Sequence, residues 1–179
     1  MRTIITGGTG LIGRALAADL ATDGHRVVLL SRTPERATGL PPGVRAERWD
    51  AHSAEGWGHL ADGAEAVVNL AGESIAVGRC TARRKCRIWE SRLNAGRAVV
   101  QAVELTSDDP GVVIQASGIG YYTLRGDERI AEGTSAGSDF GSSCSRVGSF
   151  DRARRGPGGV AGCHPHQRGA QCARLKASN

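Results

Sequence analysis

Short, nearly continuous apolar runs alternate with longer segments whose apolar residues recur at helical spacing. Runs of the first kind are typical of buried parallel strands, and segments of the second kind indicate amphipathic helices. The alternation predicts an α/β fold with a doubly wound parallel sheet, which binds ligands beyond the carboxyl ends of its strands. The predicted strands are residues 2–6, 26–30, 44–49, 64–70 and 112–117, and the predicted helices are 11–23, 81–105 and, at most, a short one at 53–60.

The apolar positions within the helical segments predict which faces are buried. In residues 11–23 they are Leu11, Ile12, Ala15, Leu16 and Leu20. In residues 81–105 they are Ile88, Leu93, Gly96, Val99, Val100 and Val103. The first two turns of the second helix carry Arg83, Arg84, Lys85 and Arg87, and such a run of charges is usually a solvated face.

A glycine-rich turn, Thr6-Gly7-Gly8-Thr9-Gly10-Leu11-Ile12-Gly13, joins the first strand to the first helix. Gly7 permits the tight turn, Gly10 lets a pyrophosphate approach the backbone, and Gly13 lets the helix pack close to the strand. The free N–H groups at the helix start attract phosphate. A plain strand–helix turn is the alternative, but the flanking strand and helix favour a dinucleotide-binding Rossmann fold. The predicted cofactor contacts here are Thr6, Gly7, Gly10, Leu11, Ile12 and Gly13.

The residues after the second strand bear on the choice of cofactor. An acid there would accept hydrogen bonds from the ribose hydroxyls of NAD, but this chain has Ser31 and Arg32, with Arg36 one turn further. A guanidinium suits the additional phosphate of NADP, so we expect NADP to be preferred over NAD. The alternative is that Arg32 is a solvated surface charge.

Other predicted contacts follow the remaining strands at the same edge of the sheet. We expect Asp50 to approach the adenine. After the fourth strand, Leu70, Ala71 and Gly72 leave room for the cofactor, and Ser117 ends the fifth strand. This convergence on one rim predicts a single site more strongly than any one motif does.

Composition limits the alternatives. With 179 residues, 40% of them hydrophobic, the chain is long enough for one domain with a real core. It has no apolar run that could span a membrane and no signal-peptide pattern, and its five cysteines form no CxxC pair. We therefore expect a cytoplasmic protein with free thiols. The cysteines and histidines near the C-terminus match no zinc spacing, so no metal site is predicted.

Residues 141–179 differ from residues 1–140. They hold seven basic residues against one acid, Asp151, which accounts for the net charge of +5, and only one leucine and no isoleucine. We expect a Rossmann domain at 1–140 and an irregular tail at 141–179 that cannot fold by burying apolar surface. The hypothesis is loss of the reading frame at or just after Phe140. The alternative is a genuine basic tail that binds acidic partners or nucleic acid by charge, without specific nucleic-acid recognition.

The same boundary makes the predicted Rossmann sheet incomplete. Without a sixth strand, the apolar fifth strand forms an open edge, and the helix that should cover that face is missing. We therefore expect marginal stability and self-association through this edge.

Several motifs together resemble a known family. The turn at residues 6–13 resembles the fingerprint of extended short-chain dehydrogenases/reductases. Residues 69–76, Gly78-Arg79, Ser91-Arg92 and residues 116–122 resemble a narrower branch, the NAD(P)-binding "epimerase family" proteins, some of which have carried a cell-division-inhibitor label. The resemblance covers about residues 1–140. The branch usually has Trp where this chain has Cys80, and its members are longer.

The resemblance implies NADP binding and a small-molecule substrate, of unknown identity, above the nicotinamide. It implies that Ser117 hydrogen-bonds the reacting carbonyl or hydroxyl, and that Tyr121 and Tyr122 lie on the nicotinamide side. Glu73 and Arg79 match family positions near the site.

The usual proton-transfer pair of this superfamily is absent from the sequence. Reductase and epimerase chemistry there uses a Tyr whose pKa is lowered by a Lys four residues later. The two lysines, Lys85 and Lys176, follow Thr81 and Cys172 at that spacing, and Tyr121 is followed by Arg125 on a predicted loop. Enzyme activity therefore stays open: we expect an impaired epimerase/reductase-like domain, or alternatively a non-catalytic dinucleotide-sensing or protein-binding module.

Overall fold

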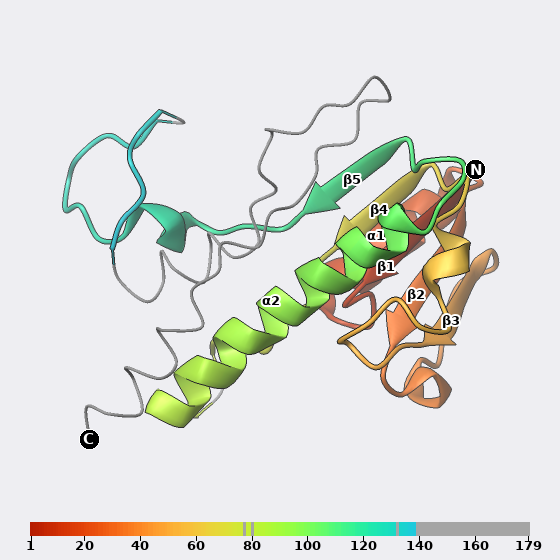
Figure 1. The fold of residues 1–179 in the computed structure, drawn as a ribbon, viewed down its shortest axis with the longest axis horizontal. Coiled ribbons are helices and arrows are strands. Elements are labelled where there is room, and N and C mark those ends of the chain that lie inside the picture. The colour runs from red at the N-terminus through yellow and green to blue at the C-terminus, as the bar shows by residue number, and fades with distance from the viewer. Residues whose placement is uncertain (77, 80, 132, 139–179) are drawn as a thin grey trace.

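The computed structural model describes residues 1–76, 78–79, 81–131 and 133–138. In these residues the chain forms a parallel sheet, two α-helices and three short 3₁₀ helices (Figure 1). The expectations for residues 141–179 lie outside the described residues, and the proposed domain division stays a prediction. The strands are β1 (Arg2–Thr6), β2 (Arg26–Ser31), β3 (Val44–Arg48), β4 (Ala66–Asn69) and β5 (Val112–Gln115); the helices are α1 (Leu11–Thr22), α2 (Ala82–Glu104), η1 (Pro34–Arg36), η2 (Gly58–Leu60) and η3 (Ile119–Tyr122).

The strand order is β3-β2-β1-β4-β5, and all four neighbouring pairs are parallel. The order reverses between β1 and β4, because the chain first winds outward to β3 and then crosses back to the other side of β1. α1 and α2 lie on opposite faces of the sheet (Figure 1). The doubly wound Rossmann architecture is therefore confirmed, and its ligand-binding crevice is expected at the carboxyl ends of β1 and β4.

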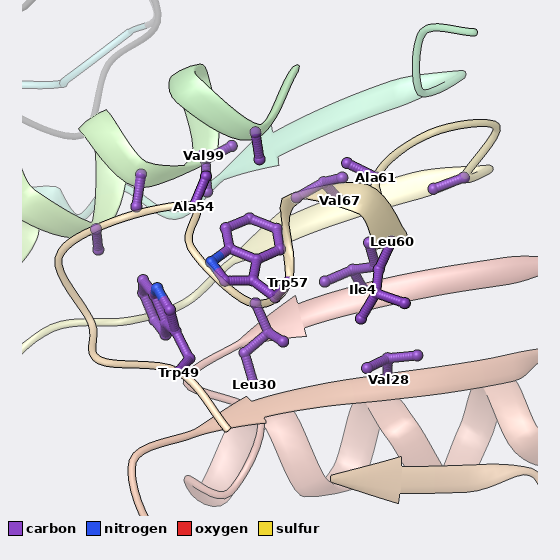
Figure 2. Packing of buried hydrophobic residues seen from close by; sticks show 14 residues of the cluster. Ile4, Val28, Leu30, Trp49, Ala54, Trp57, Leu60, Ala61, Val67 and Val99 are labelled. Carbon is purple, nitrogen blue, oxygen red and sulfur yellow. The ribbon is translucent and has the colours of Figure 1, made fainter. Parts of the chain in front are cut away.

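The larger apolar core lies between the sheet and α2. Trp57 is fully buried there and meets Trp49 edge to face, with ring centroids 6.1 Å apart (Figure 2). Both indole N–H groups donate to the Ser53 carbonyl at 2.8 Å, which satisfies the polar atoms that two buried tryptophans bring into a core. The same segment contains only the 3₁₀ helix η2, so no α-helix forms at residues 53–60.

The predicted buried face of the first helix is wrong at its start. Leu11 and Ile12 are 90% and 68% exposed, and Ala15 is also exposed. Gly13 and Ala17 are buried instead, with Leu16 and Leu20 half-buried. Small residues let α1 approach the sheet closely, and its first turn begins where the strands end, so the large side chains there have no strand beneath them.

The second helix follows the prediction closely. Thr81 caps α2, because its Oγ1 accepts the Arg84 N–H at 3.3 Å. The buried positions include Ile88, Leu93, Gly96 and Val99 as expected, whereas Val100 and Val103 are only half-buried. In the described part of the chain, no helix is both long and apolar enough to cross a membrane.

Candidate functional site

The glycine turn packs against the segment that follows β4. Gly7 has φ +67°, and a Cβ there would lie 2.9 Å from backbone atoms of Leu70 and Ala71. A Cβ on Gly13 would lie 2.5 Å from the Cα of Gly8. The close approach that requires Gly13 is therefore to the turn itself, which corrects the expectation of direct helix–strand packing. Neither glycine can be replaced without moving backbone.

The start of α1 presents three backbone donors without acceptors. Gly10 occupies the N-cap, and its own N–H donates to the Gly7 carbonyl at 3.0 Å. Among the described residues, the N–H groups of Leu11, Ile12 and Gly13 have no acceptor, and no side chain caps the helix. Such a helix start attracts an anion through its N–H groups and its partial positive charge.

The loop after β2 carries unpaired cationic groups. Ser31 is buried, and its hydroxyl accepts the Thr33 N–H at 3.2 Å. Glu35, the acid of this loop, is paired with Arg48 at 3.0 Å. Arg32 and Arg36 are exposed, and in the described chain their guanidinium groups have no partner. The free charge beyond β2 is therefore positive.

Asp50 lies just beyond β3 and organises a tight turn. Its carboxylate accepts the N–H groups of His52 and Ser53 at 2.7 and 2.9 Å and the Ser53 hydroxyl at 2.8 Å. Desolvation raises the pKa of Asp50, but these hydrogen bonds outweigh it, so the pKa lies below its ordinary value. The carboxylate is thus ionised and fixed in place. An adenine contact stays a prediction.

A chain of buried polar groups links the carboxyl ends of β1, β4 and β5. Thr6 Oγ1 donates to Asn69 Oδ1, and Asn69 Nδ2 donates to Gln115 Oε1 at 2.6 Å. The Ala71 N–H donates to Thr6 Oγ1 and Asn69 Oδ1 at 3.3 and 3.2 Å. Thr6 is therefore fully engaged in fixing the segment beyond β4, which places Leu70 and Ala71 against the glycine turn.

Gly72 and Glu73 continue this segment toward α2. The Glu73 carboxylate forms an ion pair with Arg87 at 3.3 Å. Arg79 is exposed, and its carbonyl accepts the Thr81 N–H at 3.0 Å in front of the helix. The N-terminal end of α2, to which these contacts lead, extends past the strands (Figure 1).

The predicted catalytic residues lie beyond β5, away from the glycine turn along the rim. Ser117 is exposed just after β5, and Tyr121 and Tyr122 form η3 with ring centroids 5.0 Å apart. Arg125 donates to the Tyr122 carbonyl at 3.1 Å and to Ser135, and pairs with Glu128. Arg125 thus ties the loop together, and no hydrogen bond joins it to the Tyr121 hydroxyl among the described residues.

The structure thus brings together the residues at β1 and β4, places Ser31, Arg32, Arg36 and Asp50 beside β2 and β3, and leaves Ser117, Tyr121 and Tyr122 beyond β5. Sequence reasoning missed Arg14, whose guanidinium donates to the Thr9 and Thr38 carbonyls at 3.1 and 3.2 Å. The only sequence feature that could have indicated Arg14 is its position one helical turn after Gly10, next to the glycine turn. No cluster of potential metal ligands occurs in the described ranges, and the tail cysteines and histidines lie outside them.

The sequence model of the NAD dependent epimerase/dehydratase family matches residues 3–138. The chain belongs to this family. Among curated relatives, the epimerase family protein YfhF of Bacillus subtilis is 34% identical over 139 residues, covering 78% of this chain and 44% of that protein. The bovine epimerase family protein SDR39U1 is 32% identical over 164 residues, covering 88% and 50%. This family member thus spans about half the length of the curated relatives it matches.

Solved structures agree with the family assignment. Human epimerase family protein SDR39U1, solved with NADPH, has a TM-score of 0.64 and 28% identity, covering 82% of this chain and 47% of that one. The nucleoside-diphosphate sugar epimerase of Corynebacterium glutamicum has a TM-score of 0.61 and 33% identity, covering 82% and 29%. UDP-glucose 4-epimerase of Thermus thermophilus, complexed with NAD, has a TM-score of 0.63 and 25% identity, covering 82% and 48%.

Proposed function

We propose that the described chain is the dinucleotide-binding domain of an epimerase/dehydratase-like oxidoreductase. The observation that carries this proposal is the start of α1, where the N–H groups of Leu11, Ile12 and Gly13 have no acceptor among the described residues. They stand beside a turn in which Gly7 leaves no room for a side chain. The pyrophosphate would bind these groups, and the exposed Leu11 and Ile12 side chains would contact the cofactor.

NADP is the cofactor that the loop after β2 favours. Arg32 and Arg36 offer unpaired charge there, while Glu35 is engaged by Arg48. A guanidinium can pair with the ribose phosphate of NADP, whereas NAD offers only hydroxyls at that position. The relatives alone do not decide, because the human protein was solved with NADPH and the Thermus protein with NAD.

The test replaces both arginines and compares two cofactors. In Arg32→Ala/Arg36→Ala, we expect NADPH to bind about tenfold or more weakly, since charge-assisted hydrogen bonds contribute roughly 1.5–3 kcal/mol. The Kd for NADH should change little. Arg97→Ala, which removes an exposed charge on the outer face of α2, is the control. Titration of NADPH and NADH fluorescence measures both constants, and an equal loss for both cofactors would refute the NADP preference.

Catalysis by this chain is a separate proposal. The bound nicotinamide would supply hydride transfer, Ser117 would hydrogen-bond the reacting oxygen, and Tyr121 and Tyr122 would lie on the nicotinamide side. Glu73 stays a proposed cofactor contact. The identity of that small molecule stays open. Arg125 donates to the Tyr122 carbonyl and to Ser135, so within the described residues it does not serve as the cation beside the Tyr121 hydroxyl that the usual proton transfer needs. We therefore propose impaired turnover.

A non-catalytic dinucleotide-sensing module is the second candidate, favoured by that engagement of Arg125. Cofactor binding without turnover of any carbonyl substrate, together with a defined protein partner, would support it. Turnover of NADPH with a carbonyl compound would support the enzyme. A cytoplasmic location also stays a prediction.

The proposed loss of reading frame near Phe140 concerns residues outside the described part. Translation of the other two frames beyond codon 140 tests it, because a restored frame should encode a helix followed by a valine- and isoleucine-rich strand.

A further inference from the structure

The segment that follows β4 is bound to one side of α2 at two consecutive residues, Glu73 and Ser74. Ser91 and Arg92 bind the backbone of Glu73 from both sides, and Arg84 Nη2 donates to the Ser74 carbonyl at 2.7 Å. Arg87 adds the ion pair with the Glu73 carboxylate. These four α2 residues recur at helical spacing and so face the segment together. None of the chemistry proposed above uses Ser91 or Arg92.

The Ser91 hydroxyl has a single consistent orientation. Its Oγ lies 2.9 Å from the Ile88 carbonyl, to which it donates, as serines in helices commonly do. The oxygen then accepts the Glu73 N–H at 2.9 Å. Because its one proton is committed to the helix, the hydroxyl can act toward Glu73 only as an acceptor.

Arg92 holds the next backbone group and covers Gly72. Its Nη1 donates to the Glu73 carbonyl at 3.1 Å and to the Ile88 carbonyl at 3.0 Å, which uses both of its protons. A Cβ on Gly72 would lie 3.1–3.2 Å from the Arg92 side chain. The guanidinium therefore lies directly against the Gly72 backbone, and a side chain at residue 72 would push it away.

The other end of the segment is fixed to β1. The Leu70 N–H donates to the Thr6 carbonyl at 3.1 Å, and the Ala71 N–H donates to the Thr6 and Asn69 side chains. With the Glu73 N–H taken by Ser91, Gly72 has the one N–H of residues 70–73 for which the described residues provide no acceptor. The Gly72 peptide is thus held at both sides, and its N–H is left open next to the residues, Leu70 and Ala71, that pack against Gly7.

We propose that Ser91 and Arg92 are positioning residues that hold the 70–73 segment in the orientation that receives the dinucleotide. They act through Gly72 and Glu73 and need not touch the cofactor. A preformed segment costs less ordering entropy on binding, so its release from α2 weakens binding even where the domain stays folded. This inference rests on the proposed dinucleotide function.

The experiment measures Kd for NADPH in the full chain, well below each variant's Tm, together with the Tm without ligand. The variants are Ser91→Ala, Arg92→Ser, Gly72→Ala and the double variant Gly72→Ala/Arg92→Ser. Arg97→Ser is the matched control, because it removes an arginine from the exposed face of the same helix. We expect Ser91→Ala and Arg92→Ser each to weaken binding about five- to tenfold, and Arg97→Ser to leave it unchanged.

The double variant separates positioning from general stability. Gly72→Ala should displace Arg92 and weaken binding, but once Arg92 is Ser the added methyl meets no guanidinium and should cost nothing further. If the loss of NADPH affinity in the double variant equals the product of the losses in the two single variants, the inference is overturned. It is also overturned if Ser91→Ala and Arg92→Ser lower only the Tm and bind NADPH normally. If the parent chain binds neither NADPH nor NADH, the proposed function itself fails; if it binds and the variants bind equally well, the positioning role alone fails.

Discussion

The two halves of the sheet differ in how well their side chains are covered, and one row of side chains that crosses the sheet shows this. The register aligns Leu29 of β2, Ile5 of β1, Val68 of β4 and Ile114 of β5 on the same face. The first three are 0%, 0% and 6% exposed, but Ile114 is 50% exposed. α1 packs over β1, β2 and β3, whereas no helix of the described part covers this face of β5.

The half of the sheet proposed to bind the cofactor is covered by elements of the described chain, whereas the half proposed to bind substrate is exposed on this face. The turn, α1 and the segment after β4 interlock through Gly7, Gly13 and the Thr6–Asn69 hydrogen bond. β5 pairs only with β4 among the described strands. Fixed geometry thus concentrates where a dinucleotide is proposed to bind.

The largest expected effect comes from matched truncations within that row. Ile5→Ala should lower the free energy of unfolding by about 3–4 kcal/mol, because it leaves a cavity beneath α1. Ile114→Ala should cost less than about 1 kcal/mol, since half of that side chain already contacts solvent. Urea unfolding of both variants measures the difference. Equal losses of stability would show that β5 is covered in solution, and would contradict the difference between the two halves of the sheet.

Two glycines with similar backbone angles isolate the crowding at the turn. Gly7→Ala should cost about 2–3 kcal/mol, because a positive φ and contact with the segment after β4 both oppose a Cβ. Gly24 has φ +80° with no atom within 4 Å, so Gly24→Ala should cost only about 1 kcal/mol. Thermal unfolding compares the two variants. The same loss of stability at both positions would mean that the glycine turn can accommodate a Cβ at residue 7.

The exposed edge of β5 is expected to mediate self-association. We propose that the parent chain associates with increasing concentration, and that Ile114→Lys reduces this, because a charge on an edge strand opposes pairing with another chain. Leu124→Lys is the control, since Leu124 is 97% exposed but lies on the loop beyond the sheet. Light scattering after gel filtration gives the masses. A parent chain that stays monomeric throughout would refute the expectation.

The smallest effect is predicted for Asp62, at the opposite end of the sheet. The Asp108 N–H, followed by the Ser107 N–H, donates to its carboxylate and lowers its pKa below 3.8. A lowered folded-state pKa gives stability that is complete above the unfolded value and is lost as the pH falls through the folded one. Asp62→Asn should therefore flatten the decline of Tm between about pH 5 and pH 3. Asp19→Asn, on exposed α1, should leave that slope unchanged.

Sequence patterns predicted those parts of the fold that depend on local residues. The apolar runs located β1 and β2 to within a residue, and the helical spacing of apolar residues located α2 equally well. Periodicity failed at Leu11 and Ile12, because it cannot show where a helix overhangs its sheet. It predicted at most a short helix at residues 53–60, and the structure has the 3₁₀ helix η2 (Gly58–Leu60) there, after the hydrogen-bonded turn at Asp50.

The sequence predicted the glycines of the candidate site, but it did not predict the side chains that hold the neighbouring segments in place. The turn and the small residues after β4 were identified by spacing alone, although their roles at a cofactor stay predictions. The hydrogen bonds of Arg14 to Thr38, and those of Ser91 and Arg92 to Glu73, join segments that are distant in the chain. No pattern in one sequence encodes such contacts, so only the folded arrangement reveals them.

The most direct measurement is a thermal melt of the purified chain alone, with NADPH and with NADH. A ligand at 100 times its Kd should add about 2.7 kcal/mol to the stability of a protein that binds it only when folded. We predict one cooperative transition whose Tm rises by several degrees with NADPH and by less with NADH. A transition that responds to neither cofactor, or no cooperative transition at all, would contradict the claim that this half of the sheet forms a complete dinucleotide site.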